Sequence, residues 1–263
     1  MRLFHSTIAI LICLLSVAVA TAQDRAATTP SGTDPSAANA SQTQNAIDRA
    51  AAANRYVFLF FWKEDSPQTD KAWAVLKPTI AKMADAADFV SIRVTNPAEK
   101  KTVDKYGVSR APMPMVLAIA PSGAITKAFT KSFDEKELRT AFVSPCTQRC
   151  LKALQDRKVV FVCIVDQANP QDKVAIPKGV EDFKADKKQA ATTEIVVVNQ
   201  RDANEATFLK ELEVGVHAAP VTVFLAPPGV NVGAFGSTTT KETFVAKLAE
   251  AQSGCGAGCS CHH

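Results

Sequence analysis

The chain has 263 residues, with 30 lysines and arginines against 26 aspartates and glutamates, which gives a formal net charge of +4. The basic residues are scattered among acidic ones and form no stripe, so the sequence indicates no nucleic-acid partner. Even without its terminal segments, the chain is long enough for two domains of ordinary size.

Residues 1–22 have the three parts of a secretory signal peptide. Arg2 lies in the basic end, Ile8–Val19 form an apolar core, and residues 20–22 read Ala-Thr-Ala, a small-residue cleavage site. The apolar run is too short to span a bilayer, so we expect no stable membrane anchor after cleavage. The mature protein is therefore expected to be exported, to the periplasm or the extracellular space, where cysteines meet an oxidising environment.

Residues 23–45 are rich in Ala, Ser, Thr, Pro, Asn and Gln and show no apolar period. Such a segment cannot bury enough apolar surface to fold, so its composition predicts a disordered linker. Folded structure is expected from residue 46 onward.

A hairpin pattern occurs twice in the chain. Residues 114–129 and 220–235 align without a gap, and six of the sixteen positions are identical, including the first proline of each copy. Each copy reads as a strand, a Pro/Gly turn and a second strand. A repeat of this kind indicates two similar structural units in one chain.

The likeness extends upstream of the hairpins. Tyr56–Phe61 and Val159–Val165 are short apolar runs, rich in β-branched and aromatic residues, as expected of strands buried on both faces. A Gly-Val pair beginning at Gly107 matches one beginning at Gly215. The predicted order in each copy is strand, helix, strand, helix, hairpin, helix. This order divides the chain into domains at residues 46–143 and 144–251, followed by a tail at 252–263.

This order of elements, with a hairpin opened by proline, resembles the thioredoxin fold. The resemblance covers about residues 46–251 and implies an α/β protein of two tandem thioredoxin-like domains, each a mixed central sheet flanked by helices. In that family the proline is a cis residue beside the active site. The resemblance places it at Pro220 in the second copy. In the first copy the hairpin register favours Pro114, whereas the spacing from Gly107 points to Pro112.

The redox motif of that family is absent. Active thioredoxins continue the first strand as Phe-Trp-x-x-x-Cys-x-x-Cys, in which the first cysteine lies at a helix N-terminus and becomes a thiolate. Phe61 and Trp62 are present here, but the two cysteine positions are Ser66 and Thr69. A hydroxyl cannot cycle through a disulfide, so no catalytic residue is assigned. Ser66 and Pro67 suit the N-cap and first position of a helix, which is a sufficient structural reason for both.

Two cysteines open the second domain. Ser144 and Pro145 suit the start of a helix, which puts Cys146 in the first turn and Cys150 four residues later on the same face. That spacing suits two ligands of one metal ion and, less well, a disulfide. The equally weighted alternative is that Cys150 packs in the core while Cys146 stays partly exposed. Cys163, inside an apolar run, is interpreted as an inert core residue.

The tail carries the most specific chemical pattern in the sequence. Thiolate and imidazole ligands suit Zn(II) or Cu(I), and a metal could order a segment that has no large apolar side chain. The alternatives are a disulfide-bonded flexible tail and a cloning tag, although two histidines are too few for a tag. The candidate ligands are separated only by Gly, Ala and Ser, and they are Cys255, Cys259, Cys261, His262 and His263.

Three classes of function remain open. The favoured one is an exported, non-redox binding or metal-handling protein that acts through its Cys/His-rich tail, with a metal ion or a protein as its partner. The second is a thiol-disulfide oxidoreductase whose working cysteines have moved to Cys146, Cys150 and the tail. The third is a protein-interaction module with structural cysteines only. One fold hosts many functions, so the fold by itself does not decide between them.

Overall fold

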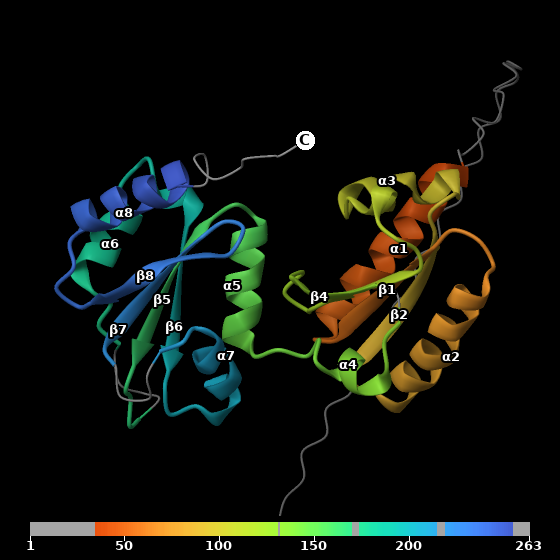
Figure 1. Cartoon of the computed structure of the whole chain (residues 1–263), viewed down its shortest axis with the longest axis horizontal. Coiled ribbons are helices and arrows are strands. Elements are labelled where there is room, and N and C mark those ends of the chain that lie inside the picture. Colours follow the sequence, from red (N-terminus) through yellow and green to blue (C-terminus); the bar gives the residue numbers. More distant parts are fainter. Residues whose placement is uncertain (1–34, 131, 170–173, 215–218, 255–263) are drawn as a thin grey trace, which may run out of the picture. The chain divides into compact units, whose positions relative to one another are not determined.

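The structure is a computed structural model, and it describes residues 35–130, 132–169, 174–214 and 219–254, with side chains from Thr43 onward. The described residues form two four-stranded sheets, each with its own helices (Figure 1). We call residues 35–143 domain 1 and residues 144–254 domain 2. None of the helices in these ranges is long and apolar enough to cross a membrane. The expected signal peptide and the five candidate ligands of the tail lie outside the described residues.

Domain 1 contains the elements predicted for the first copy, with one additional helix at its start. In chain order they are α1 (Pro35–Ala52), β1 (Tyr56–Trp62), α2 (Pro67–Lys82), β2 (Ala87–Arg93), the 3-10 turn η1 (Pro97–Glu99), α3 (Lys100–Lys105), η2 (Val108–Arg110), β3 (Met115–Ile119), β4 (Ile125–Thr130) and α4 (Glu135–Arg139).

Domain 2 repeats this order. Its elements are α5 (Pro145–Gln155), β5 (Val159–Val165), α6 (Lys178–Ala185), η3 (Ala190–Thr192), β6 (Thr193–Asn199), η4 (Ala203–Glu205), α7 (Ala206–Glu211), β7 (Val221–Ala226), β8 (Val230–Gly236) and α8 (Lys241–Gly254).

The two sheets have the same topology. The strand orders are β2-β1-β3-β4 and β6-β5-β7-β8. In each sheet the first strand pairs in parallel with the second and antiparallel with the first strand of the hairpin. The pairs Val116–Phe129 and Thr222–Phe235 hold the same place in their hairpins, as the ungapped repeat requires. The prediction of two tandem thioredoxin-like domains, each with its own mixed sheet, is confirmed.

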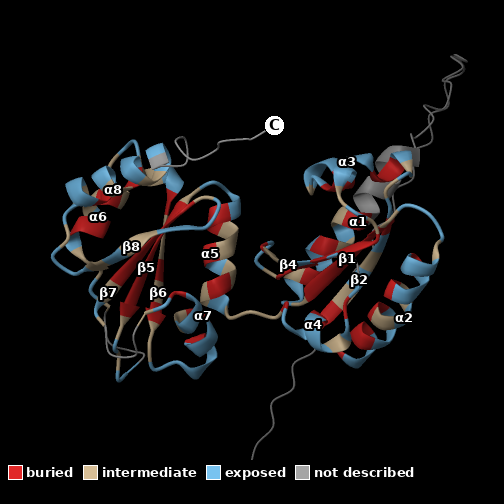
Figure 2. Ribbon diagram, viewed as in Figure 1, coloured by how far each residue is buried: buried red, intermediate tan, exposed pale blue. Residues whose placement is uncertain are grey.

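The central strands β1 and β5 are buried on both faces, as their uninterrupted apolar sequences predict (Figure 2). In β1, Phe58 and Phe60 face α2 and α4, whereas Leu59 and Phe61 face α1 and α3. All four side chains are fully buried. Burying one such side chain stabilises the fold by about 1.5–3 kcal/mol, so these strands anchor both layers of the domain.

The N-terminal boundary of domain 1 corrects one prediction. Residues 23–45 were expected to be disordered throughout, but helix α1 already begins at Pro35. Thr43 is 4% exposed, and its hydroxyl donates to the buried carboxylate of Glu99 at 3.1 Å. Ile47 and Ala50, one and two turns further on, pack into the core. The sequence did not predict this helix, because its first turns have no apolar stripe and are held by a hydrogen bond to a distant residue.

A buried glutamate holds the first helix in each domain. Glu99 and Glu205 each end a single 3-10 turn, and the side chains of Asn96 and Asp202 cap those turns. In domain 2 the Ser144 hydroxyl donates to Glu205, and the Cys146 backbone N–H donates to Glu205 Oε1 at 3.2 Å. Each carboxylate is thus hydrogen-bonded, which offsets the cost of burying it.

The structure also corrects the alignment of the two copies. Gly107 follows α3 with a φ of 64°, and the residue with the same conformation after α7 is Glu213, with a φ of 57°. Glu213 therefore occupies the position of Gly107, and the match between Gly107 and Gly215 is wrong by two residues. With Glu213 in place, both copies have seven residues from this position to the hairpin proline. The spacing from Gly107 pointed to Pro112 instead of Pro114 because the match to Gly215 was displaced by these two residues.

Replacing Glu213 with glycine is expected to stabilise domain 2. A residue with a Cβ costs roughly 1–2 kcal/mol in the left-handed conformation, and glycine does not pay this penalty. We expect Glu213→Gly to raise the free energy of unfolding by about 1 kcal/mol, measured by denaturant titration. Glu213→Ala, which keeps the Cβ, is the matched control. If the glycine variant is no more stable than the alanine variant, the backbone at residue 213 is not strained.

Candidate functional site

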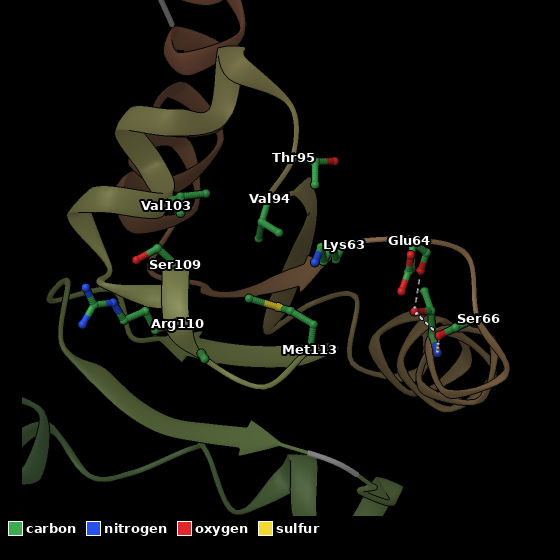
Figure 3. A pocket seen from close by; sticks show the side chains of 11 residues that line it. Lys63, Glu64, Ser66, Val94, Thr95, Val103, Ser109, Arg110 and Met113 are labelled. Atoms are coloured by element: carbon green, nitrogen blue, oxygen red, sulfur yellow. Dashed lines mark hydrogen bonds between the residues drawn. The ribbon is translucent and has the colours of Figure 1, made fainter.

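The candidate site lies at the carboxyl ends of the parallel strands β1 and β2, where ligands commonly bind in open α/β sheets. A pocket of about 520 Å³ is found there, and we call it the polar pocket. In Figure 3 the Met113 side chain extends from the side of Ser66 toward Ser109 and Arg110. The residues that line the pocket are Lys63, Glu64, Ser66, Thr69, Val94, Thr95, Val103, Ser109, Arg110, Ala111 and Met113.

Ser66 and Thr69 form a hydrogen-bonded turn at the wall of this pocket. Ser66 is the N-cap of α2, and its Oγ accepts a hydrogen bond from the Thr69 backbone N–H at 3.2 Å. The two hydroxyl oxygens are 3.0 Å apart. The Thr69 hydroxyl also lies 3.0 Å from the Glu64 carbonyl, to which it donates. The Ser66 hydroxyl therefore caps α2, as the sequence predicted.

A cis peptide bond lies next to these hydroxyls. The bonds Met113–Pro114 and Ala219–Pro220 are cis, and Pro112 is not preceded by a cis bond. The structure therefore agrees with the candidates Pro114 and Pro220. A third cis bond, Pro227–Pro228, lies in the second hairpin turn and was not foreseen.

A second pocket, of about 490 Å³, shares Met113 with the first. Its walls are mostly apolar, and we call it the apolar pocket. It lies along one face of α2, beside the cis-proline. The two pockets differ in polarity and meet at the Met113 side chain, which lines both, and we call the pair the Met113 cleft. The residues of the apolar pocket are Gln68, Lys71, Ala72, Val75, Met113, Pro114, Ser132 and Phe133.

The two tryptophans of domain 1 pack against neighbouring side chains. The Trp73 ring lies 4.4 Å from that of Phe60, and the Lys77 ammonium stands 4.4 Å above Trp73. Trp62 donates its indole N–H to the Ser91 hydroxyl at 2.9 Å. Neither tryptophan lines the Met113 cleft. Both are partly buried and pack against the core of domain 1.

The cysteines of α5 lie in a setting unlike that of a redox pair. Ser144 caps the helix and Pro145 is its first residue, as the sequence predicted. Cys150 is 2% exposed, whereas Cys146 is half-buried with its thiol 3.5 Å from the Val197 carbonyl. Burial, together with the nearby Glu205 carboxylate, raises the pKa of the Cys146 thiol to about 12. Burial also raises the pKa of Cys150 to about 12.

Both thiols are consequently protonated at neutral pH, whereas exchange requires a thiolate. The three cysteines within the described ranges are free. No group of three or more Cys, His, Asp or Glu in those ranges is placed to hold a metal ion. Cys163 is buried in β5, where the Thr222 hydroxyl lies 3.8 Å from its sulfur. This position agrees with the interpretation of Cys163 as a core residue.

Slow alkylation of Cys146 is the expected consequence. A pKa three units above the ordinary value leaves roughly a thousandfold less thiolate at pH 8. In a Cys150→Ser background, iodoacetamide should therefore modify native Cys146 far more slowly than the denatured chain, as followed by peptide mass spectrometry. Adding Glu205→Gln removes the nearby negative charge and should raise the native rate. Native alkylation as fast as in the denatured chain would contradict the raised pKa.

Several predicted residues lie outside the described ranges, and others were missed. The five candidate ligands of the tail are not described. In domain 1, Ser66 and Thr69 line the same pocket as Met113, the residue before the cis-proline Pro114. Lys63, Met113 and Arg110 were not singled out, although Met113 could have been found as the residue before the favoured proline. Glu205 was also missed, and the spacing Asx-x-x-Glu in both copies was the available signal.

Comparisons with known proteins add little to this description. No protein-family model matches the chain, and no curated protein matches it. Among solved structures it is similar to the first two thioredoxin domains of Saccharomyces cerevisiae Eps1p. The identity is 13%, 77% of this chain and 94% of that chain are covered, and the TM-score is 0.30.

Two further solved structures show similarly low identities and TM-scores. Human ERp44 in a zinc-bound form is 9% identical, with 78% of this chain and 58% of that chain covered and a TM-score of 0.34. Thioredoxin O2 from Arabidopsis thaliana is 13% identical, with 38% and 84% covered and a TM-score of 0.32. This chain thus spans less than two thirds of the ERp44 structure. At these scores and identities the comparisons carry no argument, and the thioredoxin-like fold is defined by the strand order of the two sheets.

Proposed function

We propose that this chain is an exported, non-redox binding protein that holds an extended polypeptide segment in the Met113 cleft. The observation that carries the proposal is the pair of pockets of about 520 and 490 Å³ that meet at Met113, beside two hydroxyls instead of two thiols. Pockets of this size are typical of ligand sites.

A redox role is poorly supported by the chemistry of the described cysteines. Residues 46–143 contain no cysteine, so the cleft itself has no thiol to exchange. Cys146 and Cys150 lie in domain 2, and both have pKa values raised to about 12. A thiol that stays protonated is a weak nucleophile. The oxidoreductase alternative therefore depends on the tail alone.

A polypeptide suits the cleft better than a compact ligand. The two pockets differ in polarity and share only one residue, so successive side chains of an extended segment can enter them separately.

Filling the cleft should abolish binding of an unfolded polypeptide. Met113 is only half-buried, and a Met113→Trp side chain would occupy the junction of both pockets. We expect the affinity for fluorescently labelled, reduced and carboxymethylated lactalbumin to fall at least about tenfold, measured by anisotropy.

Val245→Trp is the matched control, because Val245 is 41% exposed on α8 and lines neither pocket. Unfolding temperatures of both variants show whether each is folded. No binding by the unmodified protein, or equal binding by the Met113→Trp variant, would exclude the cleft as the binding site.

We further propose that the tail binds Zn or Cu. Its last nine residues include Cys255, Cys259, Cys261, His262 and His263, and four such ligands suffice for a tetrahedral site. Cys150 is buried in the core, and Cys146 contacts a backbone carbonyl. These placements favour a site completed by the tail alone, without the α5 pair.

Deletion of residues 254–263 should therefore remove all the bound metal. Elemental analysis of protein purified under mild reduction should give about one Zn or Cu per full-length chain and none for the truncated chain. A Cys146→Ser, Cys150→Ser variant with an intact tail is the control and should keep its metal. Full-length protein that neither carries nor takes up more metal than the truncated form would contradict the proposal.

A further inference from the structure

The cleft has a charge pattern that bears on which polypeptides it accepts, and this inference rests on the proposed function. Lys63 and Arg110 line the polar pocket, and Lys71 lines the apolar pocket. Within the described parts of the chain, none of these three cations forms an ion pair. Glu64 is the one carboxylate that lines either pocket, so the charges of the lining residues sum to +2.

The lack of an ion pair is not peculiar to these three residues, because other described lysines of domain 1, such as Lys101 and Lys136, form none either. Arg55 with Asp88 at 2.7 Å and Arg139 with Glu135 at 2.9 Å are examples of paired cations. The cations of the cleft remain available to a ligand. Lys63 and Arg110 line the same pocket as the hydroxyls of Thr95 and Ser109, which can donate hydrogen bonds to an oxyanion.

The apolar pocket favours an apolar side chain. Phe133 is buried, Ala72 is 6% exposed, and Val75 and Met113 are half-buried beside them. An aromatic or aliphatic side chain placed there would displace water from these walls, which is favourable in proportion to the apolar area covered. The shared Met113 keeps this side chain next to whatever occupies the polar pocket.

We propose that the Met113 cleft binds extended segments in which an apolar side chain is followed or preceded by an acidic one. The apolar side chain occupies the pocket formed by Ala72, Val75 and Phe133. The carboxylate of the neighbouring Asp or Glu lies in the polar pocket, between Lys63 and Arg110. Glu64 opposes this preference, and Asp65 and Asp70 lie close in the sequence but line neither pocket.

The test compares three peptides that differ at one position. Each is an acetylated and amidated Gly/Ser peptide with a central Phe-Glu, Phe-Gln or Phe-Lys pair and a fluorescent label, so no terminal charge contributes. Exposed charges interact weakly, so we expect Phe-Glu to bind about fivefold tighter than Phe-Gln at low salt, and Phe-Lys to bind weakest. A Lys63→Glu, Arg110→Glu variant should reverse this order.

A charge-matched control separates the effect of the charges inside the cleft from the effect of the net charge of the protein. Lys101→Glu with Lys136→Glu changes two exposed lysines of the same domain that line neither pocket, and it should keep the order of the three peptides. Equal affinity for all three peptides, or the same change in both double variants, would overturn this inference and leave the proposed function standing. If neither the peptides nor unfolded lactalbumin bind, the proposed function itself is wrong.

Discussion

The architecture depends on two strands that are buried on both faces, β1 and β5. A strand in this position must pair its backbone on both edges, because an unpaired N–H or C=O without water is costly. The parallel partner on one side and the hairpin on the other meet that requirement in each domain. Helices must then cover both faces, and the chain supplies them in the same order twice. The topology thus follows from the placement of one apolar run near the start of each copy.

The same strands position the candidate site. The chain leaves β1 at Trp62 and must turn back into α2, so the turn and the start of the helix lie at the carboxyl end of the sheet. The Ser66 hydroxyl caps the helix start, and the Thr69 hydroxyl donates to the Glu64 carbonyl in the same turn. The turn thus holds two hydroxyls and no thiol. What remains is a cleft with unpaired cations and an apolar wall.

The fold could be predicted from local patterns, whereas much of the site could not. The hairpin repeat and the apolar runs gave both sheets, because strand burial and turn residues are properties of short segments. Helix α1 was missed because Thr43 is held by Glu99, fifty-six residues away. Arg110 and Lys63 come to line one pocket only through the folding of the chain, so their spacing in the sequence carries no signal. The Gly107–Gly215 match failed because Glu213 has a positive φ, a backbone conformation that is not expected of a glutamate.

The buried Glu205 affects how Cys146 reacts once domain 2 has folded. A cysteine in the first turn of a helix usually faces the positive end of the helix dipole, which favours the thiolate. Here a carboxylate accepts a hydrogen bond from the Cys146 backbone N–H, and its negative charge works against that dipole. The folded domain therefore keeps Cys146 protonated, and this thiol would exchange with a disulfide more slowly than an exposed cysteine of ordinary pKa.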